Sequence, residues 1–132
     1  IVEDEPLMAE TLHQVVREAA PDAIVRVLLE PERAMDAVER SAPHLILLDL
    51  RMPTMNGVEV AMCLRGTRLA DHTTIVAVSG NVQPKDAHVL QRLGITRVVH
   101  KGGDLVDTLV PLVSDLRAAS EAEERARIAG LS

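Results

Sequence analysis

The hydrophobic positions of this chain fall into short apolar runs that alternate with amphipathic stretches. Each run is about as long as a β-strand, and the central runs contain few polar residues. The runs cover residues 1–2, 24–29, 45–48, 75–78 and 98–99. Strands of this composition are typical of a parallel sheet whose two faces are both covered. The pattern therefore predicts a buried parallel sheet.

Helical patterns lie between these runs. In the first pattern, apolar residues recur at helical spacing from Met8 to Ala19. Further helices are expected from residue 31 to just before residue 43, after residue 57, and from residue 84 to residue 94. Proline favours the first turn of a helix, and glycine commonly follows the last turn. The alternation predicts an α/β fold: an open, doubly wound, five-stranded parallel sheet with helices on both faces and right-handed crossovers.

Two features fit this scheme less simply. Ile1 and Val2 alone are too short for a central strand, so we expect further residues before Ile1. Pro111 interrupts the apolar pattern of the last helix, where a proline costs about 3 kcal/mol or more. We therefore expect this helix to start late, with Thr108 as its cap and Pro111 in its first turn. The alternative is a kink at Pro111.

The length and composition predict one domain with an extension. The chain has 132 residues, and 47% of them are hydrophobic although it contains no Phe, Tyr or Trp. A chain of this size can bury a core of ordinary proportions. We assign residues 1–117 to the domain. Residues 118–132 are charged and helix-prone, end near Gly130, and are expected to form a helical linker outward.

Charge and cysteine content exclude several classes of protein. The net charge of −6 and the absence of aromatic residues argue against a nucleic-acid binder. The single cysteine, Cys63, excludes an internal disulfide framework and a multi-cysteine metal site, and we expect it to be buried on the third helix. No apolar run approaches the about 20 residues of a membrane helix. A cytoplasmic location without membrane contact is expected.

Polar residues with useful chemistry follow the predicted strands. Ligands of an open parallel sheet bind outside the carboxyl ends of its strands. The residues at those ends are Glu3, Asp4, Glu5, Asp49, Ser79, Gly80, His100 and Lys101. Clustered carboxylates repel one another unless a cation lies among them, and Mg²⁺ accepts carboxylate oxygens readily. With metal, ammonium and hydroxyl in place, Asp49 could attack a phosphoryl donor as a nucleophile.

Four segments of the chain share a further pattern: Val2–Pro6, Leu47–Gly57, Val78–Gly80 and His100–Lys101. Together they resemble the receiver domain of two-component response regulators. The Asp-x-x-Met-Pro-x-x-x-Gly pattern of residues 49–57 is the most specific part, and the resemblance covers roughly residues 1–117 in order. It implies a flavodoxin-like fold with strand order 2-1-3-4-5. It also implies a signalling domain that catalyses only its own phosphotransfer and slow dephosphorylation.

The resemblance implies a role for each site residue. Asp49 would accept a phosphoryl group from a phosphohistidine on a sensor histidine kinase or phosphotransfer protein. Glu3, Asp4, Asp49 and the backbone carbonyl of Arg51 would hold Mg²⁺. Lys101 would bind the phosphoryl group, and Ser79 would move toward it and couple it to an output face.

This sequence departs from the family pattern at three places, one of which is Gly102, which follows Lys101 where proline is common. Glu3 stands where aspartate is commoner, so its contact to the metal is expected to run through water. Val98 stands where the family often carries an aromatic reporter of activation. The signal from Ser79 is therefore expected to travel through backbone shifts and aliphatic repacking.

Other interpretations of these residues stay open. The acidic residues 3–5 could be an acidic first turn favoured by the helix dipole, Ser79 could satisfy a backbone group, and Lys101 could be a surface lysine. A binding module without phosphorylation is a second class. A true kinase or phosphatase is a third, although its usual motifs are missing.

The output is the least determined part. We expect a DNA-binding transcription regulator acting through a domain outside this sequence, and the alternative is a stand-alone receiver or phosphorelay module that acts on a protein partner. Homodimerisation through the fourth and fifth helices, or through the extended fifth helix, is also expected.

Overall fold

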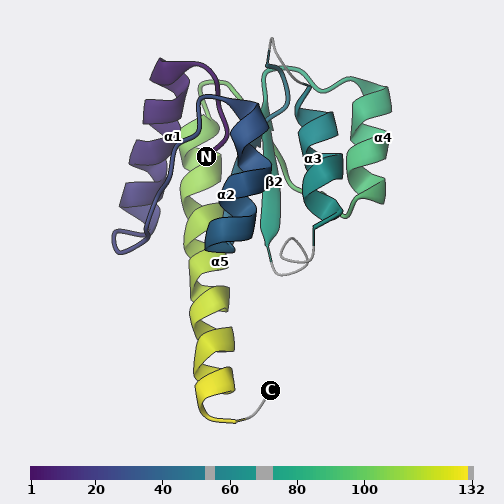
Figure 1. Ribbon diagram of the computed structural model, residues 1–132. Coiled ribbons are helices and arrows are strands. Elements are labelled where there is room, and N and C mark those ends of the chain that lie inside the picture. Colours follow the sequence, from purple (N-terminus) through teal and green to yellow (C-terminus); the bar gives the residue numbers. More distant parts are fainter. Residues whose placement is uncertain (53–55, 68–72, 131–132) are drawn as a thin grey trace.

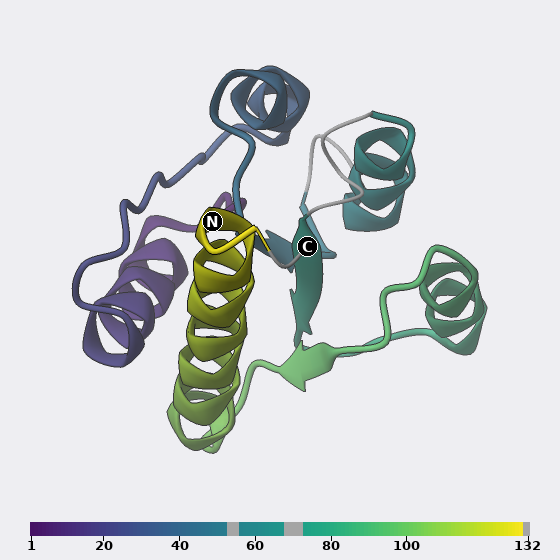
Figure 2. The ribbon, with the colours of Figure 1, turned by 90° about the horizontal axis from the view of Figure 1, so that it is seen from below.

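The protein has three layers, with a parallel sheet between two layers of helices (Figures 1 and 2). The computed structural model describes residues 1–52, 56–67 and 73–130. The elements are α1 (Pro6–Ala19), η1 (Pro31–Arg33), α2 (Ala34–Ser41), β1 (Leu45–Asp49), α3 (Gly57–Arg65), β2 (Thr74–Ser79), α4 (Pro84–Arg92), β3 (Val98–His100) and α5 (Leu105–Ile128). The α/β architecture and the parallel sheet predicted from the sequence are confirmed.

The sheet has three strands within the described residues, in the order β1-β2-β3, so the prediction of five strands is wrong. Val2 forms only isolated parallel bridges, to Leu28 on one side and Leu48 on the other. A β-ladder needs several consecutive pairs, whereas the backbone hydrogen bonds here are those of Leu28 with Ile1 and Glu3. Ile24, at the start of the expected second strand, is 96% exposed. The bridges still place the segments in the predicted order.

Two hydrophobic clusters fill the space on either side of the sheet. Ile46 and Leu48 of β1 pack against residues of α2, α3 and α4, whereas Leu47 packs against residues of α1 and α5. Successive side chains of a strand point to opposite faces, and here both faces are covered. This explains why the strands lack an alternation of polar and apolar residues.

The predicted helix ends agree with the structure in most cases. Proline occupies the first turn of α1 and α4, where its missing N–H leaves no hydrogen bond unmade. Gly94 follows α4 with φ of 78°, a conformation that glycine adopts without strain. The helix expected from residue 31 begins with the short η1 before α2.

The late start expected for the last helix is wrong. α5 begins at Leu105 and contains Pro111 in its interior. Leu105 and Leu109 are buried against α1, and this packing stabilises the turns that precede the proline. The carbonyl of Asp107, which lacks its usual donor at Pro111, belongs to an exposed residue and can be solvated.

The second half of α5 extends beyond the layered body of the protein (Figure 1). It runs to Ile128, with Gly130 after it at φ of 72°. Ion pairs three or four residues apart, such as Arg125–Glu121, lie along this extension. The sequence predicts a charged helical linker over residues 118–132, and in the structure α5 continues as a helix to Ile128.

Cys63 is exposed, so the expectation that it is buried is wrong. α3 buries Val60, Ala61 and Leu64, which share one helical face. Cys63 lies off that face because of the helical period.

Candidate functional site

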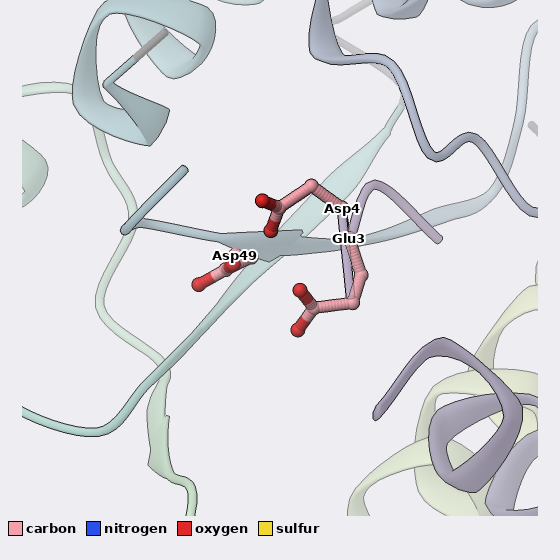
Figure 3. Close-up of side chains that lie close together, drawn as sticks. All are labelled: Glu3, Asp4 and Asp49. Atoms are coloured by element: carbon pink, nitrogen blue, oxygen red, sulfur yellow. The ribbon is translucent and has the colours of Figure 1, made fainter. Parts of the chain in front are cut away.

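The carboxyl ends of the strands bring the predicted residues together at one edge of the sheet. β1 ends at Asp49, β2 ends at Ser79, and Lys101 follows β3. Asp49 N–H donates to the carbonyl of Val2, which places Glu3 and Asp4 beside the end of β1. Figure 3 shows the three carboxyl groups of Glu3, Asp4 and Asp49 gathered at this edge. The convergence predicted from parallel topology is confirmed.

Asp49 is almost completely buried, with 1% of its surface exposed. Its Oδ1 accepts a hydrogen bond from the backbone N–H of Arg51 at 3.0 Å and lies 3.1 Å from Nζ of Lys101. Its Oδ2 is buried and has no hydrogen-bond partner among the described residues. A buried oxygen of this kind is costly unless something binds it. Asp49 therefore has one oxygen that contacts Arg51 and Lys101, and a second oxygen that is available to bind a ligand.

Lys101 joins the two buried carboxylates. Its Nζ lies 2.7 Å from Oε1 of Glu3 and 3.1 Å from Oδ1 of Asp49. Burial lowers the pKa of Lys101, but the two carboxylates raise it more, so the net shift is upward. The ammonium stays charged at neutral pH. The sequence predicts Lys101 at this edge of the sheet, but it does not predict the pairing with Glu3.

Glu3 is fully buried and carries a strongly perturbed carboxyl group. Burial raises its pKa to about 7, although Lys101 and the backbone N–H of Glu5, which donates to Oε2 at 3.1 Å, act in the opposite direction. The neighbouring carboxylate of Asp49 adds to the rise. Glu3 is thus only partly ionised near neutral pH when no further cation is present.

The acidic cluster fits a divalent cation. One carboxylate oxygen from each of Glu3, Asp4 and Asp49 lies within 4.8 Å of the others. Three carboxylates face the single ammonium of Lys101, and Oδ2 of Asp49 has no hydrogen-bond partner among the described residues. Oxygen ligands in this number suit Mg²⁺, which keeps several waters as further ligands. That the backbone carbonyl of Arg51 is a further metal ligand is an expectation from the family resemblance alone.

Asn56 and Gly57 define the start of α3 and place it close to the end of β1. Asn56 caps the helix, because its Oδ1 accepts from the N–H of Val58 at 2.8 Å. A Cβ at Gly57 would lie 2.2 Å from the carbonyl oxygen of Asp49, so only glycine allows this close approach. The sequence pattern contained Gly57 but gave no physical reason for it. Residues 53–55 of the pattern lie outside the described residues.

Ser79 is fully buried, and its hydroxyl is directed to its own loop. Oγ donates to the carbonyl of Asn81 at 3.2 Å and accepts from the N–H of Asn81 at 3.3 Å. Nε of Arg51 donates to the same carbonyl at 3.3 Å. Sequence reasoning did not identify Asn81, because its role depends on a backbone carbonyl that any residue carries.

The family model for the response regulator receiver domain matches residues 1–110. The chain belongs to this family. The receiver is 30% identical, over 99% of its length, to protein-glutamate methylesterase/protein-glutamine glutaminase 1 of Anaeromyxobacter dehalogenans, of which it covers 38%. It is 27% identical, over 95% of its length, to the nitrate/nitrite response regulator protein NarL of Escherichia coli, of which it covers 65%.

A solved structure supports the fold of the receiver. The CheY-like response regulator receiver domain protein of Methanospirillum hungatei superposes with a TM-score of 0.75 at 16% identity, over 92% of this chain and 94% of the other. In the part of the receiver that the structure describes, no helix combines the length and apolarity that crossing a membrane requires.

Proposed function

We propose that this receiver is a phosphorylation-activated switch of a two-component system, located in the cytoplasm. Asp49 accepts a phosphoryl group from a phosphohistidine of a sensor histidine kinase or phosphotransfer protein. The observation that carries the proposal is the buried, unpartnered Oδ2 of Asp49, next to the ammonium of Lys101 and the acidic cluster. This arrangement offers a nucleophile together with cationic stabilisation of the transferred group.

The transfer forms one bond and breaks another. An oxygen of the Asp49 carboxylate attacks phosphorus, the phosphorus–nitrogen bond of the donor breaks, and the released imidazole takes up a proton from solvent. Lys101 stabilises charge on the phosphoryl oxygens, and bound Mg²⁺ would supply further neutralisation there. Attack by water on phosphorus later releases inorganic phosphate and restores the carboxylate of Asp49.

Activation then depends on Ser79. For its hydroxyl to donate to a phosphoryl oxygen on Asp49, it must leave the carbonyl of Asn81. The new charge of about −1.5 to −2 provides a driving force for that exchange. Val98 pairs with Ala77 in the sheet beside the end of β2, so aliphatic repacking at β3 can follow a shift of Ser79.

Phosphoryl uptake from a small donor tests the proposal. Incubation with acetyl phosphate and Mg²⁺ should add one phosphoryl group, measured by intact mass, and Asp49→Asn should abolish the uptake. Asp36→Asn is the matched control, because Asp36 is an exposed carboxylate of α2 that pairs with Arg40. Unchanged uptake in Asp49→Asn would refute the assignment.

For the output, we propose control of DNA-binding transcription regulation through a domain outside this sequence. NarL, one relative, is named as a nitrate/nitrite response regulator, and other relatives are named as methylesterases, which are enzymes. A stand-alone receiver or phosphorelay module is the second candidate. The full-length gene product decides between them: a chain that stops near Ser132 would contradict the DNA-binding proposal.

We also propose that phosphorylation favours a homodimer through α4 and α5. α4 buries only Leu90 among its residues and lies at the periphery of the protein, and α5 continues beyond the body (Figure 1). Light scattering with and without beryllofluoride, which mimics the phosphoryl group, measures the mass. An unchanged monomer mass under both conditions would refute the dimer.

A further inference from the structure

The resting position of the Ser79 hydroxyl is held by one backbone unit. Its only proton is given to the carbonyl of Asn81, and its oxygen accepts the N–H of the same residue. Ser79 is fully buried, so breaking these bonds leaves polar atoms without water unless new partners are present. The strength of the bond to Asn81 therefore affects how readily the hydroxyl turns toward Asp49.

Arg51 contacts both sides of this arrangement. Its backbone N–H donates to Oδ1 of Asp49, and its side-chain Nε donates to the carbonyl of Asn81. Arg51 thus links the loop after β1 to the loop after β2. The carbonyl of Asn81 accepts two donors at once, from Ser79 and from Arg51.

Both bonds to this carbonyl are long. The hydroxyl of Ser79 lies 3.2 Å from it, beyond the usual range of about 2.5–3.0 Å for such bonds, and Nε of Arg51 lies at 3.3 Å. Two donors on one acceptor share its electron density, so each bond is weaker than it would be alone. When Ser79 leaves, Arg51 still satisfies the carbonyl.

We propose that Arg51 is a positioning residue that loosens the hold of Asn81 on the Ser79 hydroxyl and so eases its transfer to a phosphoryl oxygen on Asp49. The proposal rests on the proposed function of Asp49. It differs from an electrostatic role of the guanidinium, because it requires only a donor at the Nε position and it requires Ser79.

Two substitutions separate the donor from the charge. Arg51→Gln places an amide nitrogen at the position of Nε, bonded to Cδ as Nε is, and removes the charge. Arg51→Met has the same length and removes both donor and charge. Neither change alters the backbone groups of Arg51. Both variants lack the charge, so a difference between them reports the amide of glutamine and not the charge of Arg51.

The measurement is the affinity for beryllofluoride with Mg²⁺ by titration calorimetry, since the chain has no aromatic residue to serve as a fluorescent reporter. Arg51→Met should bind beryllofluoride about two- to tenfold more weakly than Arg51→Gln, which is the change in affinity that the net free energy of one hydrogen bond produces. In a Ser79→Ala background the two variants should bind equally. Circular dichroism checks that each variant is folded.

Each other outcome counts against the proposal in a recognisable way. Equal affinities of Arg51→Gln and Arg51→Met in the presence of Ser79 would overturn it. A difference that persists in the Ser79→Ala background would also overturn it, because Arg51 would then act without Ser79. No binding by the wild-type protein, or equal binding by Asp49→Asn, would refute the proposed function itself and the inference with it.

Discussion

Replacing Glu3 by glutamine should stabilise the metal-free protein at neutral and alkaline pH. Glu3 is fully buried, and its carboxyl has a pKa of about 7 in the folded protein against an ordinary value of 4.5. Glutamine has nearly the same shape and carries no charge. The substitution therefore removes the cost of ionising a buried group, at the expense of the metal site.

The size of the effect follows from the pKa shift. The folded protein holds the Glu3 proton more tightly than the unfolded chain, so this group lowers stability as pH rises from about 4.5 to about 7 and no further above that. Each pKa unit corresponds to about 1.4 kcal/mol. Allowing for relaxation around the cluster, we expect ionisation of Glu3 to cost about 1–3 kcal/mol above pH 7.

Urea unfolding followed by far-ultraviolet circular dichroism, with EDTA present, measures this effect. The free energy of unfolding of Glu3→Gln, relative to that of the wild type, should rise by about 1–3 kcal/mol as the pH is raised from about 5 to about 8. Glu39→Gln is the control, because Glu39 is exposed on α2 and should show no such gain. With Mg²⁺ added, the wild type should recover more stability than Glu3→Gln. A difference between Glu3→Gln and wild type that does not change with pH would refute the reasoning.

Two further substitutions test the fold around the site. Gly57→Ala should lower the free energy of unfolding, measured in urea, by about 3 kcal/mol or more, because the added Cβ meets the backbone of Asp49 and Leu50. Gly103→Ala is the control, because nothing lies within 4 Å of a Cβ there. Equal losses of stability in the two variants would contradict the argument. Pro111→Ala should stabilise the protein by about 1–2 kcal/mol, because it restores the N–H that can donate to the carbonyl of Asp107 within α5. A loss of stability in Pro111→Ala would show that the proline is not strained.

The convergence of Asp49, Ser79 and Lys101 could be predicted because it depends on topology. Parallel strands joined by helices present their carboxyl ends at one edge, whatever the details of packing. The strand lengths could not be predicted in the same way. The apolar run at residues 24–29 has the composition of a strand, but a strand also needs paired backbone groups, and only Leu28 has a bridge partner.

Local rules failed where packing outweighed them. A proline inside a helix is unfavourable, yet burial of Leu105 and Leu109 holds α5 in place before Pro111. The contact of Lys101 with Glu3 and the bond of Ser79 to Asn81 depend on side-chain rotamers and loop conformation. The sequence specifies which polar groups are present at such a site, but it does not specify which acceptor each hydrogen-bond donor binds.

The central claim is that Asp49 is the residue that becomes phosphorylated. After incubation with acetyl phosphate and Mg²⁺, borohydride reduces an aspartyl phosphate to homoserine, and peptide sequencing by mass spectrometry then locates the change. The buried, unpartnered Oδ2 of Asp49 predicts homoserine at position 49 and nowhere else. Homoserine at Asp4 or another carboxylate, or phosphoryl uptake that leaves residue 49 as aspartate, would contradict the claim.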